Sequence, residues 1–149
     1  MPIIDQIVGY HEEMTAWRRD LHAHPETAFE EFRTSDFVAA KLQEFGVEID
    51  RGLAGTGVVG TLHCGDGPAI GLRADMDALH IHEENEFAHR STIDGKMHAC
   101  GHDGHTIMLL GAARYLAETR NFTGTVQFPV GPRRHDDVAP KKFRDLERG

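Results

Sequence analysis

Several side chains of the types that bind metals lie close together near residue 100. His98, Cys100, His102 and His105 stand within eight residues, with Asp103 among them. Thiolate and imidazole are good ligands for zinc-like metals. Because alternate side chains of an extended segment share one side, we expect Cys100 and His102 to reach one ion together. Zinc takes four ligands and this pair supplies two, so spacing alone leaves a metal site and a purely structural role equally open.

A second group of polar residues follows a predicted strand at residues 69–75. Asp75 and Asp77 are expected to point to the same side, where one carboxylate can bind a metal and the other can orient a ligand. A solvated acidic turn is the alternative for this pair. The ionisable residues further along are expected to form a solvated loop face: His80, His82, Glu83, Glu84 and Glu86.

The elements that must position these groups predict a layered α/β domain. Apolar residues at helical spacing predict helices over 3–22, 34–45 and 104–118. Runs of β-branched residues bounded by glycine predict strands over 47–49, 58–63, 69–75 and 125–128. The loop between them, about 76–103, is long for a compact domain, and such loops are usually functional.

Composition excludes several classes of protein. The chain has 149 residues, about one domain, with 40% hydrophobic and 27% charged residues and no apolar run of membrane-spanning length. A formal charge of −8 argues against a nucleic-acid partner. The N-terminus has no basic region typical of an export signal, so free thiols are expected at Cys64 and Cys100. A cytoplasmic protein without a membrane partner is expected.

Four segments stand in an order and spacing that are specific together, although each is a weak signal alone. They read RRDLHAHPE at 18–26, GTGVVG at 55–60, LRADMDAL at 72–79 and MHACGHDGHT at 97–106. In these segments the chain resembles the aminoacylase and carboxypeptidase family of metallohydrolases. The resemblance is to the branch of hippurate hydrolases and indole-acetyl-amino-acid hydrolases, and it extends from about Trp17 to Phe128.

The resemblance implies a three-layer, aminopeptidase-like α/β/α catalytic domain, of which this chain would be an N-terminal part without the inserted dimerisation domain. It implies two divalent ions per complete site, of zinc, manganese, cobalt or nickel, and hydrolysis of the amide bond of small N-acyl amino acids such as hippurate. The motif match makes Cys100 and His102 metal ligands and Asp77 an acidic residue behind them. Oligomeric state stays open.

The chain departs from the family pattern after Phe128. In the family the corresponding strand ends in Pro-Ala-Glu-Glu, which supplies the general base and a metal ligand. Here Pro-Val-Gly-Pro-Arg-Arg follows, without an acidic pair. Residues 129–149 also hold three of the six prolines and six of the sixteen Lys and Arg. We therefore expect family sequence over 1–128 and a disordered or loosely packed, non-family tail over 129–149, arising from a shifted reading frame or from a natural extension.

These expectations give three functional hypotheses. The first is a hydrolase fragment that is inactive alone because it lacks the general-base glutamate. The second is a non-catalytic metal-binding or interaction fragment. The third is an enzyme whose missing parts come from a partner chain.

Overall fold

The computed structural model describes residues 4–133, which fold as a mixed α/β structure, so the predicted fold class is confirmed. The elements follow one another in the order α1 (Asp5–Val8), α2 (His11–Ala23), α3 (Phe32–Glu44), β1 (Glu48–Leu53), β2 (Gly57–Cys64), β3 (Ala69–Gly71), β4 (Ala74–Asp75), α4 (His102–Thr119) and β5 (Gly124–Gly131).

The strands form one mixed sheet in the order β1-β2-β5-β3, and β4 pairs with β5 beyond β3. The β1–β2 and β2–β5 pairs are antiparallel, whereas β3 and β4 run parallel to β5. The last strand in the sequence is therefore inserted between β2 and β3. This places the end of β4, and the residues that follow it, beside the end of β5.

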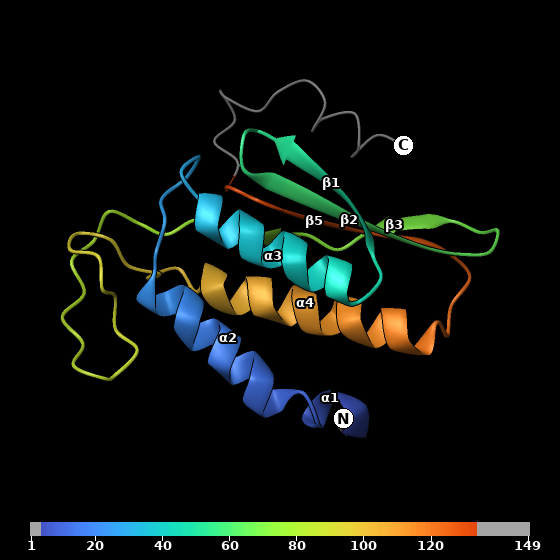
Figure 1. Ribbon diagram of the computed structural model, residues 1–149, viewed down its shortest axis with the longest axis horizontal. Helices are drawn as coiled ribbons and strands as arrows, with labels where there is room; N and C mark the ends of the chain where they lie inside the picture. Colours follow the sequence, from blue (N-terminus) through green and yellow to red (C-terminus); the bar gives the residue numbers. More distant parts are fainter. Residues whose placement is uncertain (1–3, 134–149) are drawn as a thin grey trace.

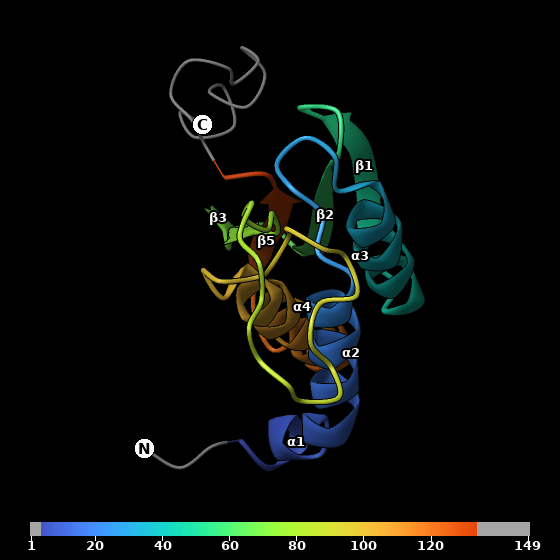
Figure 2. The same cartoon turned by 90° about the vertical axis from the view of Figure 1, so that its left-hand side faces the viewer.

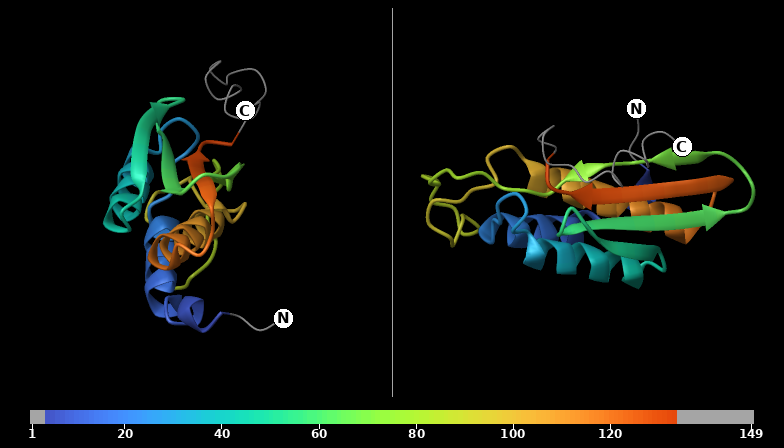
Figure 3. Two further views of the ribbon diagram at one scale, coloured as in Figure 1. Left: turned by 90° about the vertical axis from the view of Figure 1, so that its right-hand side faces the viewer. Right: turned by 90° about the horizontal axis from the view of Figure 1, so that it is seen from above.

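Helices α3 and α4 pack against one face of this sheet, as the view from above shows (Figure 3). Helix α2 packs on α4 on the side away from the strands, and α1 lies at its outer end (Figures 1 and 2). Among residues 4–133 no helix covers the opposite face. The described part of the chain therefore forms two layers of the three-layer arrangement that the resemblance implies.

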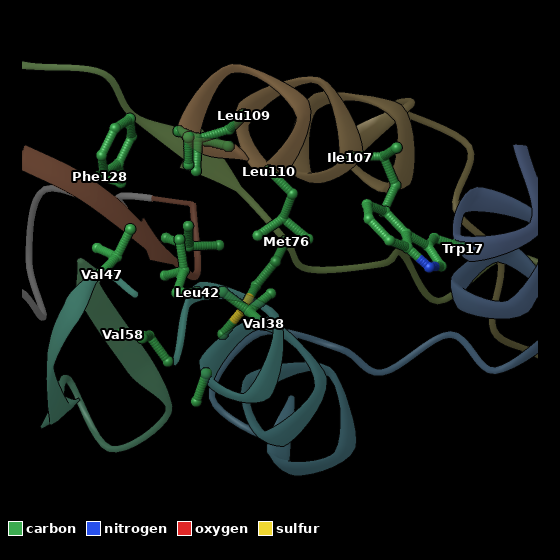
Figure 4. Close-up of a cluster of buried hydrophobic side chains, with 14 of the residues drawn as sticks. Trp17, Val38, Leu42, Val47, Val58, Met76, Ile107, Leu109, Leu110 and Phe128 are labelled. Carbon is green, nitrogen blue, oxygen red and sulfur yellow. The ribbon is translucent and has the colours of Figure 1, made fainter. Parts of the chain in front are cut away.

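A single apolar core fills the space between the sheet and the helices (Figure 4). Phe128 from β5, Leu42 from α3 and Leu110 from α4 have no exposed surface, and Met76 lies between the helices just after β4. Trp17 extends the core toward α2 and meets Phe37 with ring centroids 6.3 Å apart. Burial of this kind is the main favourable term in folding, and here it fixes α3 and α4 on the sheet.

The predicted helices are present, with different ends. The helix expected over 3–22 is divided at Gly9 and Tyr10 into α1 and α2. Helix α3 begins two residues earlier than predicted because Glu26 caps it: its carboxylate accepts the backbone N–H groups of Arg33 (3.0 Å) and Thr34 (2.8 Å). Gly46 follows α3 with a φ of +76°, the left-handed conformation expected after a helix.

Strand β5 continues past Phe128 to Gly131, so its predicted end was wrong. Pro129 was predicted to begin a different segment, but it lies within β5. The strand tolerates a residue without an N–H at this position, because the parallel partner β3 pairs only as far as Gln127 and β4 pairs only from Val130 onward. The strand expected over 69–75 is divided into β3 and β4, and the gap between them lies opposite Pro129. The predicted division into 1–128 and 129–149 stays a prediction, and the tail from residue 134 lies outside the described residues.

The long loop after β4 is closed at its base. Leu79 and Met97 exchange two backbone hydrogen bonds of 2.9 and 3.0 Å. Ala78 donates its N–H to the Glu26 carbonyl oxygen at 2.7 Å, which ties the start of the loop to the chain after α2. The residues after β4 are thus held from two sides before the chain returns to α4.

Candidate metal centre

Asp77 and His102 form a buried polar pair between the residues after β4 and the start of α4. The Nδ1 atom of His102 lies 2.9 Å from the Asp77 carbonyl oxygen and 3.1 Å from Asp77 Oδ1. Both partners are oxygen acceptors, so Nδ1 carries the proton and donates. The lone pair of the ring is then on Nε2. A carboxylate that fixes a histidine tautomer in this way is the arrangement found behind metal-ligating histidines.

The Asp77 carboxylate also binds the chain after β5. Oδ1 accepts the backbone N–H of Arg133 at 2.8 Å. We call the region formed by Asp77, Cys100 and His102 the corner. Arg73 supports the chain beside it, because its guanidinium donates to the Pro132 carbonyl oxygen at 3.1 Å. Three segments that are distant in sequence therefore meet at one carboxylate.

Gly101 turns the chain directly before His102. Its φ of +80° lies in the left-handed region, which glycine adopts without strain, and α4 starts at the next residue. The expectation of an extended segment here was wrong: a turn at 99–100 and the helix start replace it. As a result His98 is buried while the Cys100 thiol is exposed, so these two side chains do not share a side.

The donors at this corner suit a divalent ion such as zinc, since a thiolate and an imidazole Nε2 are both good ligands for it. Within residues 4–133, however, no three side chains of His, Cys, Asp or Glu converge closely enough to hold a metal. The described residues therefore do not form a closed four-ligand site, although Cys100 and His102 have the donor types that such an ion takes. His105 is exposed, and its ring centroid lies 5.7 Å from that of His102.

Asp75 does not join this corner, contrary to the expectation that it shares a side with Asp77. Its carboxylate pairs with Arg73 at 3.1 Å, at the partly exposed sheet edge. Strict alternation fails because the strand ends at Asp75, and Met76, Asp77 and Ala78 are all buried.

A second buried network, which sequence reasoning missed, lies beside the first. His22 from α2 places Nδ1 at 2.9 Å from Asp103 Oδ2 and Nε2 at 3.1 Å from Glu83 Oε1. Arg18 approaches the same Asp103 oxygen at 3.3 Å. The one available signal was the 18–26 motif, whose residues had no chemical role in the sequence reading.

Glu83 was expected on a solvated loop face, and this was wrong: it is only 8% exposed. Burial raises the pKa of its carboxyl, but hydrogen bonds from Asn85, the Ser91 N–H and His22 outweigh burial and lower the pKa to about 2. The carboxylate is therefore ionised, and it folds the loop back onto α2. The other residues of that group are exposed as expected: His80, His82, Glu84 and Glu86.

His98 lies between the two networks without a hydrogen-bond partner, although its ring centroid is 6.3 Å from that of His22. Its ring is buried, and neither nitrogen makes a hydrogen bond; Asp103 Oδ1 is likewise buried and unpaired. Burial lowers the pKa of His98 to about 4, although the negative charge of Asp103 acts in the opposite direction. The ring is thus neutral at physiological pH.

Comparisons with known proteins find a family model and relatives that match this chain. The model for peptidase family M20/M25/M40 matches residues 71–132, which contain Asp77, Cys100 and His102. IAA-amino acid hydrolase ILR1-like 2 of Arabidopsis thaliana is 45% identical over 133 residues, covering 89% of this chain and 30% of that protein. Hippurate hydrolase of Campylobacter jejuni is 44% identical over 133 residues, covering 89% of this chain and 34% of that protein.

A solved structure shares the fold. The Bacillus subtilis YXEP protein, described as a dinuclear metal-binding peptidase of the M20 family, superposes with a TM-score of 0.84 at 38% identity. The match covers 93% of this chain and 40% of that one. The chain thus spans about a third of the length of the curated relatives it matches. No helix in residues 4–133 is long and apolar enough to cross a membrane.

Proposed function

Because this chain belongs to the peptidase family M20/M25/M40, in the branch of the IAA-amino acid and hippurate hydrolases, we propose that it carries the metal-binding corner of an amidohydrolase. Cys100 and His102 are the proposed ligands of a divalent ion, and Asp77 orients His102. The substrate class is a small N-acyl amino acid, the chemistry that the names of both relatives share.

The hydrogen bond between Asp77 and His102 is the observation that carries this proposal. A buried histidine whose Nδ1 donates to a carboxylate presents a basic Nε2 in a fixed direction. A buried polar pair must offset the loss of hydration of both groups, so it adds little to the stability of an apolar core. A role in orienting the imidazole accounts better for its presence here.

When bound, a divalent ion at such a corner acidifies a water and polarises the scissile carbonyl. The residues of this chain prepare that chemistry. Asp77 holds the proton of His102 on Nδ1 and keeps Nε2 free, and the left-handed Gly101 places Cys100 at the surface directly before the helix.

We propose that the 149-residue chain binds metal and does not turn over substrate alone. A hydrolytic site needs a base that takes a proton from the attacking water, usually a carboxylate. Residues 129–133, at the end of β5 beside Asp77, contain no acid.

Titration of the purified chain with Co²⁺ tests the ligand assignment, because cobalt bound by a thiolate gives a characteristic charge-transfer absorption. Cys100→Ala should abolish this absorption. Cys64→Ala is the matched control: Cys64 lies at the end of β2, and its thiol contacts the Arg120 carbonyl oxygen. Equal spectra for the wild type and Cys100→Ala would remove the metal role.

Release of glycine from hippurate tests the activity claim. With zinc or manganese added, the chain alone should give no release above the rate with Cys100→Ala. Turnover that depends on Cys100 would show that the chain completes its site by another route, for example with a partner chain, and would overturn the claim of inactivity.

A further inference from the structure

The 18–26 segment is part of the family pattern, yet the proposed function gives it no task. In the structure it touches both halves of the candidate site. The Glu26 carbonyl oxygen accepts the N–H of Ala78, the residue after Asp77 (2.7 Å). Four residues before it, the His22 ring contacts Asp103, the residue after His102 (2.9 Å).

We propose that His22 is a positioning residue for the candidate metal centre, because its ring bridges the first turn of α4 and the loop that follows β4. This proposal rests on the proposed function in that the positioned groups are His102 and Cys100. It adds a residue on α2 and a second buried carboxylate, Glu83, to the groups that set their geometry.

One ring joins two acidic side chains: Nδ1 lies 2.9 Å from Asp103 Oδ2, and Nε2 lies 3.1 Å from Glu83 Oε1. Both ring nitrogens are therefore engaged, and the orientation of the ring is fixed from two sides. The three side chains are almost completely buried, with 4% of His22, 8% of Glu83 and none of Asp103 exposed.

Glu83 fixes the other end of the bridge to the loop. Its carboxylate accepts the Ser91 N–H at 2.6 Å and the Asn85 side-chain amide at 2.9 Å. The loop is tied to α2 again where Thr92 donates its N–H (2.9 Å) and its hydroxyl (2.7 Å) to the Ala23 carbonyl oxygen. The loop and the end of α2 therefore form one unit around the imidazole.

That unit restrains the metal corner because Asp103 belongs to the first turn of α4. Asp103 and His102 are adjacent, so a rotation of this turn that breaks the His22 contact also moves His102 away from Asp77. In the described part of the chain, the other polar contact from α2 to this turn is that of Arg18, which approaches the same Asp103 oxygen at 3.3 Å and is half-exposed.

The first test needs no metal. The ring ¹⁵N chemical shifts of His102 report its tautomer, which is Nδ1–H in the wild type because of Asp77. His22→Gln removes the imidazole ring, and its amide oxygen cannot donate to a carboxylate. The folded variant should therefore show a mixture of His102 tautomers. His24→Gln is the matched control, since His24 is partly exposed and contacts the backbone of its own helix at Asp20. An unchanged His102 tautomer in folded His22→Gln would overturn the proposal.

The second test is Co²⁺ affinity in the same variants, compared at equal fraction folded. Loss of a residue that orients ligands typically weakens metal binding about 10- to 100-fold, so His22→Gln should bind at least about tenfold more weakly and His24→Gln should match the wild type. Wild-type affinity in His22→Gln would refute the positioning role while leaving the Cys100 and His102 assignment intact. If the wild type binds no cobalt through Cys100, the metal assignment fails, and the tautomer still decides whether His22 positions His102.

Should His22→Gln not fold, Glu83→Gln replaces it, because this change keeps the His22 contact to Asp103 and removes charge only at the loop end. The same shift in His102 tautomer, at smaller amplitude, is expected. A wild-type spectrum in Glu83→Gln would then count against the bridge.

Discussion

Replacing Asp77 with alanine removes two hydrogen bonds at one buried atom. Oδ1 accepts the N–H of Arg133 at 2.8 Å and the Nδ1–H of His102 at 3.1 Å. His102 keeps the Asp77 carbonyl oxygen at 2.9 Å, so its proton retains a partner. Arg133 is exposed, so water can replace the carboxylate at its N–H. A protein hydrogen bond contributes a net of about 0.5–1.5 kcal/mol, so the loss of two predicts a fall of about 1–3 kcal/mol in the unfolding free energy of Asp77→Ala.

The same change should weaken metal binding. Removing the carboxylate behind a ligating histidine lowers affinity about 10- to 100-fold, equivalent to about 1.4–2.8 kcal/mol. Asp77→Asn separates the two effects, because its amide oxygen can accept both hydrogen bonds while the negative charge is lost. We expect Asp77→Asn to be within about 1 kcal/mol of the wild type in stability and still weaker in metal binding.

Urea unfolding followed by circular dichroism measures the first quantity, and Co²⁺ titration against a competing chelator measures the second. Cys64→Ala serves as the control for both. If Asp77→Ala binds cobalt as tightly as the wild type, while Cys100→Ala does not bind it, then Asp77 does not orient a ligand and the geometric argument for the corner is wrong.

Three further predictions concern the rest of the molecule. Because His98 has a pKa of about 4 in the fold and an ordinary value of 6.5, the unfolded state binds more protons between these values, and stability should fall by up to about 3 kcal/mol as pH drops through this window. Urea unfolding at pH 7 and pH 5 checks this, and a His98→Leu variant with the same pH dependence would contradict it. Gly60→Ala should lose about 1–3 kcal/mol of unfolding free energy, because its Cβ would lie 3.0 Å from Val47 Cγ1 in the core. Gly71→Ala, whose Cβ would meet nothing within 4 Å, is the control. Equal urea midpoints for the two variants would refute the packing argument. Ile70 is exposed on β3, the edge strand of the described sheet, and Ile70→Lys should raise the protein concentration at which light scattering begins. The unfolding free energy should stay within about 0.5 kcal/mol of the wild type. Unchanged scattering would show that this edge does not drive association.

The local parts of the fold were predictable because they depend on short-range patterns. The apolar spacing from Ile107 to Leu116 indicates a helix that packs on a sheet, and α4 has its buried face at those positions. The ends of elements were less accessible. Helix α3 begins at Phe32 because Glu26 caps it from outside the helix, and Pro129 stays in β5 because of a gap between two partner strands.

The candidate site was predictable only in part, for a related reason. The types and order of residues indicated Cys100, His102 and Asp77. The roles of Cys100 and His102 as ligands, and of Asp77 as the acidic residue behind them, stay predictions. Spacing alone could not show that Asp77 contacts His102 across 25 residues, or that Glu83 and Asp103 meet at His22 across 61 and 81 residues. Such contacts depend on how α2 and the loop after β4 pack against α4, which no local pattern encodes.

The order of strands in the sheet has a consequence for how the chain is made. Of the strands in residues 4–133, β5 is synthesised last, yet it lies between β2 and β3 and pairs with both. Until Gly131 has emerged, the β1–β2 hairpin is the largest piece of sheet that can form, and the apolar sides of α3 and α4 have no complete surface to cover. Long-range pairing of this kind is slow and leaves apolar surface open to other chains. Nascent chains of this protein should therefore need chaperone protection until Gly131 has emerged.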